Sequence, residues 1–72
     1  MTRKFSEVRV VLARQVKARR KHLNLSQEQL ALEADVDRTY VSQIERGIGN
    51  PSLLVLHKLA VVLRIELSEL LT

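Results

Sequence analysis

Cysteine and tryptophan are absent from this 72-residue sequence, which contains only one proline and two glycines. Without cysteine the fold has no disulfides and no thiolate zinc site, so a chain this short depends on an economical helical core or on a partner subunit. With so little proline and glycine, few positions interrupt a helix. The β-branched runs are also short, and together these features predict an all-α domain built from several brief helices.

Long apolar runs are missing as well. No stretch reaches the roughly 18 residues that a membrane span needs, and the first five residues lead into charge rather than into a signal-peptide core. The hydrophobic fraction of 46% nevertheless supports a folded core and excludes a disordered chain. We therefore expect one cytoplasmic domain over residues 1–72, with no membrane partner.

Acidic residues are scarce at the start of the chain. Residues 1–21 contain eight Lys or Arg against Glu7 alone, a balance of +7, whereas the remainder carries −3 and the whole chain +4. Such a basic segment is either a solvated helix face or a surface that meets a polyanion, and composition leaves both interpretations open.

Residues suited to catalysis or metal binding are few and scattered. His22 and His57 have no neighbour at metal-ligand spacing. Asp35 and Asp37 are better explained as turn and cap residues than as a general acid and base. The Gly-Ile-Gly segment at 47–49 lacks the lysine and the preceding strand of a phosphate-binding loop. We expect no enzyme activity, no metal, no cofactor and no small-molecule ligand.

The first helix is expected to begin near Ser6, a candidate N-cap, and to place Val8, Leu12 and Val16 on one face. Arg20 occupies the next position on that apolar stripe. An arginine on an inward face usually has a carboxylate partner, because an unpaired buried charge is costly.

Two short helices joined by about three residues follow. Ser26 and Gln29 have the spacing of a capping box at the start of the first, and Asp37 is placed to cap the second. Gly47 stands where a left-handed C-terminal cap belongs.

The outer side of the second short helix is entirely polar; it consists of Arg38, Thr39, Ser42, Gln43 and Arg46. A helix fits the major groove of B-DNA, and these side-chain types read base edges there. The alternative is a small bundle in which this helix merely faces water.

The residue pattern of the C-terminal third predicts two more helices. Pro51 suits a first helical turn, and the fourth helix over 53–63 has an inward stripe of Leu56, Leu59, Ala60 and Leu63. A short helix over about 67–71 closes the domain. Several apolar residues remain for a dimer interface; they are Leu54, Val61, Ile65, Leu67 and Leu70.

Three sequence motifs carry a family resemblance: SQEQLA at 26–31, DRTYVSQIERG at 37–47 and NPSL at 50–53. Together they closely resemble the Xre or phage-repressor-like helix-turn-helix family. Within it, the chain is most similar to small dimeric regulators such as the controller proteins of restriction-modification systems, which often carry a similar Arg-Thr-Tyr sequence. The resemblance covers almost the whole chain.

The resemblance implies a compact five-helix fold with a helix-turn-helix over about 27–46. The apolar residues left over in the C-terminal third predict a dimerisation region over about 53–72. The residues that the resemblance assigns to base reading are Arg38, Thr39, Ser42 and Gln43. It assigns Gln27, with the amides at that helix start, to a phosphate. Because residues 48–50 lack a cation, we expect Arg46 and Asn50 to make the flanking phosphate contacts instead. Tyr40 is expected either to touch a phosphate or a thymine methyl, or to pack against the first helix. The resemblance also pairs Arg20 with Glu45.

The sequence departs from the family pattern in three places. Asn24 and Asp35 stand where glycine is common, and both residue types tolerate a left-handed backbone. Residues 48–50 contain no lysine or arginine, although relatives often place one there beside the phosphates.

These patterns predict a sequence-specific transcriptional regulator that binds double-stranded DNA as a homodimer on an inverted repeat. Two alternatives stay open. One is an antitoxin-like protein-interaction module with secondary DNA binding. The other is a basic amphipathic helix at a membrane surface, which is less well supported because the apolar stripe of the first helix is needed for the core.

Overall fold

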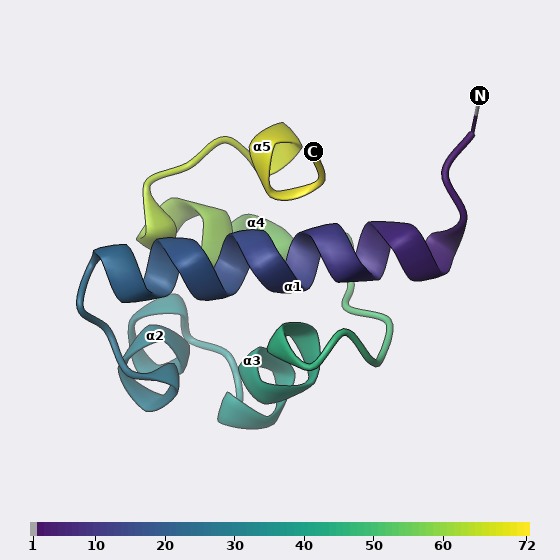
Figure 1. Ribbon diagram of the computed structural model, residues 1–72. Helices are drawn as coiled ribbons and strands as arrows, with labels where there is room; N and C mark the ends of the chain where they lie inside the picture. The colour runs from purple at the N-terminus through teal and green to yellow at the C-terminus, as the bar shows by residue number, and fades with distance from the viewer. Residues whose placement is uncertain (1) are drawn as a thin grey trace.

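The computed structural model describes residues 2–72, and in that range it contains helices and no strands. The helices are α1 (Phe5–His22), α2 (Gln27–Ala34), α3 (Arg38–Glu45), α4 (Leu53–Leu63) and α5 (Leu67–Leu70) (Figure 1). The predicted all-α, five-helix fold is confirmed. None of the described helices is both long enough and apolar enough to cross a membrane.

Helix α1 runs through the middle of the molecule, and the other helices lie around it (Figure 1). It contacts α3, α4 and α5, while α2 contacts α3 and α4. The two short helices α2 and α3, of eight residues each, lie side by side below α1 in the view of Figure 1. The predicted helix-turn-helix therefore rests on a scaffold made by the other three helices.

Every helix contributes to one apolar core. Its buried members are Leu12, Val16, Leu30, Ala31, Ala34, Val41, Ile44, Leu56, Leu59, Ala60, Leu63 and Leu70. The stripe predicted for the fourth helix is confirmed in full. Along α1 the stripe is buried at Leu12 and Val16 and only partly buried at Val8, because α1 extends beyond its neighbours at its N-terminal end (Figure 1).

The helix starts match the sequence at α2 and α3 but not at α1. Ser26 accepts a hydrogen bond from the Gln29 amide, and the Gln29 side chain accepts from the Ser26 amide, which completes the capping box. Asp37 caps α3. The prediction that Ser6 caps α1 is wrong, because Lys4 is the N-cap and its carbonyl accepts the first helical hydrogen bonds.

The start of α4 also differs from its prediction. Pro51 lies before the helix rather than in its first turn. The N-cap is Ser52, whose hydroxyl accepts from the Val55 amide at 3.1 Å. The amides in the first turn of a helix have no backbone acceptor within the helix. Ser52 supplies a side-chain oxygen to one of them, and Pro51 has no such oxygen.

Four helix ends turn through a residue with a left-handed backbone. These residues are Asn24, Asp35, Gly47 and Arg64, with φ of 59°, 55°, 71° and 57°. In the turn at Gly47, the Ile48 amide donates to the Gln43 carbonyl and the Gly47 amide donates to the Ile44 carbonyl, both at 3.0 Å. Asn24 and Asp35 thus adopt the conformation expected of them, whereas Arg64 was not anticipated.

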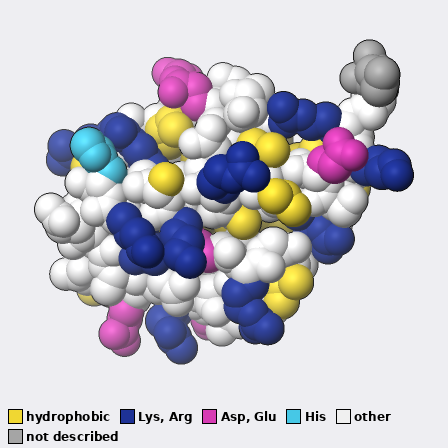
Figure 2. All heavy atoms as spheres, viewed as in Figure 1, with side chains coloured by type: hydrophobic (Ala, Val, Ile, Leu, Met, Phe, Trp, Pro, Cys, Tyr) yellow, Lys and Arg dark blue, Asp and Glu magenta, His cyan; other side chains and the backbone are white. Residues whose placement is uncertain are grey.

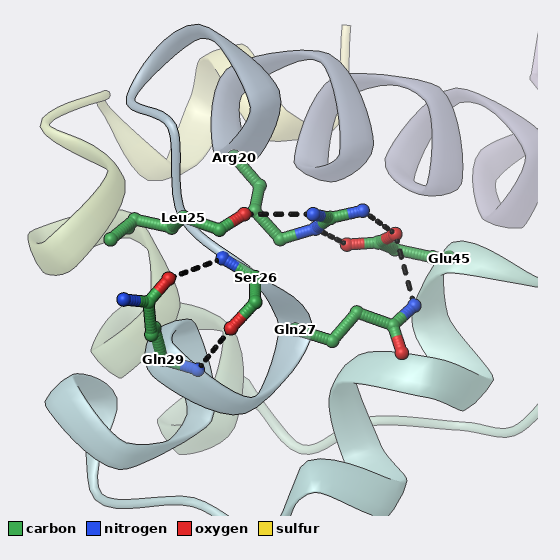
Figure 3. A network of polar contacts seen from close by, with 6 residues as sticks. All are labelled: Arg20, Leu25, Ser26, Gln27, Gln29 and Glu45. Carbon is green, nitrogen blue, oxygen red and sulfur yellow. Dashed lines mark hydrogen bonds and ion pairs between the residues drawn. The ribbon is translucent and has the colours of Figure 1, made fainter.

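A bidentate ion pair ties α1 to the end of α3. Arg20 Nε lies 2.6 Å from Glu45 Oε2, and Arg20 Nη2 donates to Glu45 Oε1 at 2.9 Å (Figure 3). Arg20 Nη1 donates to the Leu25 carbonyl at 2.8 Å. The pairing expected for Arg20 is therefore present, and the guanidinium also holds the segment that enters α2.

The pair is shielded from solvent, with 12% of the Arg20 side chain and 3% of the Glu45 side chain exposed. The hydrogen bond with Glu45 raises the pKa of Arg20 above its ordinary value, so this guanidinium stays charged. Since both charges are largely desolvated, each depends on the other.

The apolar residues left outside the core are fewer than the sequence predicted. Leu54 and Val61 are 60% and 63% exposed on α4. Assigning Leu70 to an exposed interface is wrong, because α5 contacts α1 and α4 and buries Leu70 completely. Ile65 and Leu67 are partly buried against the core, so they offer only part of their surface.

Replacement of Glu45 by alanine should lower the free energy of unfolding by about 3 kcal/mol, because it leaves the Arg20 charge desolvated without a partner. Denaturant unfolding of Glu45→Ala, Arg20→Ala and the double variant would measure the coupling. Strictly additive losses would contradict the pair.

Replacement of Arg64 by glycine should raise the free energy of unfolding by up to about 1 kcal/mol, because glycine removes the steric cost of the left-handed backbone. Arg46→Gly is the matched control, since Arg46 ends α3 with an ordinary φ of −86°. Denaturant unfolding should show stabilisation for the first variant and none for the second; equal behaviour would contradict the explanation.

Candidate nucleic-acid interface

The outer face of α3 presents the predicted polar residues together. Arg38 and Thr39 are exposed in the first turn, and Ser42 and Gln43 are partly buried one turn later. Val41 and Ile44 point to the opposite side and are buried in the core. The positions i, i+1, i+4 and i+5 therefore form one polar surface on a helix that is anchored from behind.

A charged cap begins this surface. The Asp37 carboxylate accepts from the Thr39 amide at 2.8 Å. Hydrogen bonds from the Thr39 amide and hydroxyl lower the pKa of Asp37 below its ordinary value of 3.8, and nearby Arg38 adds to the effect. The stabilisation it provides is complete above that ordinary value and disappears as the pH falls through the lower pKa of the folded protein.

Glycine at position 49 leaves room for Gln43. The backbone at Gly49 has φ +82°, and a Cβ there would lie 3.3 Å from Gln43 Oε1. A small hollow between α3 and the following loop is lined in part by Tyr40, Gln43 and Asn50. Tyr40 is 46% exposed. The structure therefore groups Tyr40 and Asn50 beside Gln43, at the edge of the polar surface.

The start of α2 joins the same network. Gln27 Nε2 donates to Glu45 Oε1 at 3.2 Å (Figure 3), so the side chain expected at a phosphate is held against α3. Helix geometry leaves the backbone amides of Gln27 and Glu28 without an intrahelical acceptor, and these amides are suited to an anion.

Arg46 is the C-cap of α3 and is exposed. It provides a cation at the end of α3, near a loop that has none at residues 48–50. Lys and Arg side chains also lie along α1 and below it on the face seen in Figure 2, where they outnumber acidic side chains.

Part of the basic segment has a structural role that the sequence did not reveal. Arg19 donates from Nε to the Leu63 carbonyl at 2.9 Å and from Nη2 to the Arg64 carbonyl at 3.3 Å. Arg3 donates to the Leu71 carbonyl at 2.9 Å. These arginines cap the C-terminal ends of helices that are distant from them in the sequence. The contacts form only in the folded protein, so no local sequence pattern predicts them.

The part of the chain that the structure describes contains no group of three or more His, Asp or Glu side chains placed to hold a metal ion. His22 and His57 are exposed and lie on different helices.

Comparison with known proteins agrees with this geometry. The chain matches the helix-turn-helix family HTH_3 over residues 16–70. It is 50% identical over 54 residues to control protein C.MunI of a Mycoplasma species, which covers 75% of this chain and 73% of that protein.

Solved structures give the same result. The restriction-modification controller protein C.AhdI from Aeromonas hydrophila has a TM-score of 0.81 at 42% identity, covering 86% of this chain and 94% of that one. SinR, the master regulator for biofilm formation from Bacillus subtilis, in complex with DNA, has a TM-score of 0.80 at 35% identity, covering 85% and 98%. The chain belongs to the HTH_3 helix-turn-helix family, and its resemblance to restriction-modification controller proteins is confirmed.

Proposed function

We propose that this protein is a sequence-specific transcriptional regulator that binds an inverted-repeat operator as a homodimer. The carrying observation is the outer face of α3, where Arg38, Thr39, Ser42 and Gln43 form one accessible polar surface. Placed in the major groove, these side chains meet base edges that differ for each base pair. SinR, a relative of the same fold, has been solved with DNA, which supports this placement.

Contacts to phosphates would fix the helix in the groove. The free amides at the start of α2 offer one anion site beside Gln27, and Arg46, Tyr40 and Asn50 flank the other end of the polar surface. Such contacts set the register of the protein on the duplex and carry little sequence information. The net charge of +4 favours approach to a polyanion.

The homodimer is assigned to the outer side of α4 within residues 53–72. Leu54 and Val61, seven residues apart, lie on one side of the helix, and Leu53 is 69% exposed. An apolar hollow lined by Leu53, Leu54, His57 and Leu67 continues this surface. Self-association about a two-fold axis would bury it and add to a small core.

Selection of bound sequences from random duplex DNA tests the proposal directly. A two-fold dimer with its recognition helices about one turn of B-DNA apart should select inverted half-sites with centres roughly 10 base pairs apart. Recovery of no preferred sequence, or of single half-sites only, would contradict it.

Replacement of Arg38 by alanine should weaken binding to the selected site by about 1 to 3 kcal/mol and flatten the preference at one base pair in each half-site. The reason is that an arginine at this turn bonds guanine O6 and N7 together. Arg46→Ala is the matched control, because loss of a phosphate contact weakens all sequences alike. Titration against the selected and a scrambled duplex separates the two; uniform weakening by Arg38→Ala would contradict base reading.

Replacement of Val61 by glutamate should give a folded monomer with a steep loss of operator affinity and an unchanged half-site preference, because a charge does not bury well at an apolar interface. Leu32→Glu serves as the control, since Leu32 is 80% exposed on α2 and does not line the hollows that contain Val61. Sedimentation should find the control dimeric. A monomeric unmodified protein that binds an isolated half-site tightly would refute the dimer.

A further inference from the structure

Asp37 lies at the N-terminal end of the polar surface of α3, and the proposed function gives it no role in DNA binding. It directly precedes Arg38 and is exposed. Asp37 lines a shallow hollow on the outer side of α3 together with Thr39, Tyr40 and Gln43. The carboxylate therefore shares a surface with two of the proposed base-reading side chains, at the end of the helix that reaches furthest toward base edges.

Capping leaves part of the carboxylate unused. Oδ1 accepts from the Thr39 amide at 2.8 Å. An ionised carboxylate offers about four acceptor positions, so most of them remain open to solvent. Because the cap holds one oxygen against the helix, the remaining acceptors have a fixed direction.

A permanent negative charge is costly at a surface that meets phosphates, and capping does not require it. Ser26 and Ser52 cap α2 and α4 through neutral hydroxyls, and serine and asparagine cap about as well as aspartate. An exposed aspartate is ionised at neutral pH, and the hydrogen bonds of the cap lower the pKa of Asp37 further. Specificity arises when a contact favours one partner and penalises others, and a carboxylate does this on DNA: it accepts from exocyclic amino groups and repels carbonyl oxygens.

We propose that Asp37 determines specificity by accepting a hydrogen bond from the exocyclic amino group of cytosine or adenine, at the base pair next to the one that Arg38 contacts. This inference rests on the proposed DNA-binding function. The cap and the base contact use different acceptor positions of the same carboxylate, so one residue starts the recognition helix and discriminates between sequences.

Two substitutions separate the cap from the contact. Asp37→Asn keeps the size of the side chain, and its Oδ1 can still accept from the Thr39 amide. Its second polar atom, Nδ2, is then a hydrogen-bond donor where the carboxylate had a free acceptor. Asp37→Ser keeps the cap but withdraws the free acceptor. Both variants should show cooperative unfolding like the unmodified protein. The base pair read by Arg38 is located from the Arg38→Ala selection profile.

Selection from random duplex DNA should give a motif with cytosine or adenine beside the Arg38 position for the unmodified protein, and the base recovered distinguishes the two. Asp37→Asn should move the preference to guanine or thymine, whose carbonyls accept from Nδ2. Asp37→Ser should flatten it, with a loss of about tenfold in discrimination at that base pair.

If both variants keep the original motif and bind every duplex more tightly by the same factor, Asp37 is only a cap with an unfavourable charge, and the inference is overturned. If the unmodified protein selects no sequence, the proposed function fails and this inference with it. A changed motif confined to one base pair supports both.

Discussion

The ion pair between Arg20 and Glu45 is the constraint on which the rest of the arrangement depends. It joins the scaffold helix α1 to the end of α3, and through Leu25 and Gln27 it also fixes the entry into α2 (Figure 3). The Arg20 guanidinium thus holds both short helices in place relative to α1. A polar surface that reads DNA needs its two helices at a fixed angle. This partly buried network holds that angle, at the cost of removing two charges from most of their water.

Most of the fold follows from local chemistry. The capping box at Ser26 and the Asp37 cap mark two helix starts, and the periodic leucines of residues 53–63 predict the inward face of α4. These signals succeed because a helix end is decided by a few adjacent side chains. Arg20 was predicted as a buried arginine from its place on an apolar stripe, and the family resemblance supplied its partner.

The features that could not be predicted from the sequence depend on packing between distant residues. Leu70 appeared available for an interface, yet α5 turns it into the core, and nothing within four residues encodes that direction. The Arg19 contacts with the end of α4 span more than forty positions, and Arg64 adopts a left-handed turn that its residue type disfavours. In the candidate interface, the positions of the polar residues on α3 were predictable. The room that Gly49 leaves for the Gln43 side chain depends on the loop geometry.

Because α2 and α3 are short, ligand binding by their polar surface depends on the folding of the whole domain. Helices of eight residues do not persist alone in water, so the polar surface exists only while the whole domain is folded. Any ligand of that surface is bound by the native population and not by the unfolded one, and it stabilises the native state by mass action. Heating should therefore release such a ligand over the same temperature range in which the core melts, which makes occupancy a readout of thermal stability.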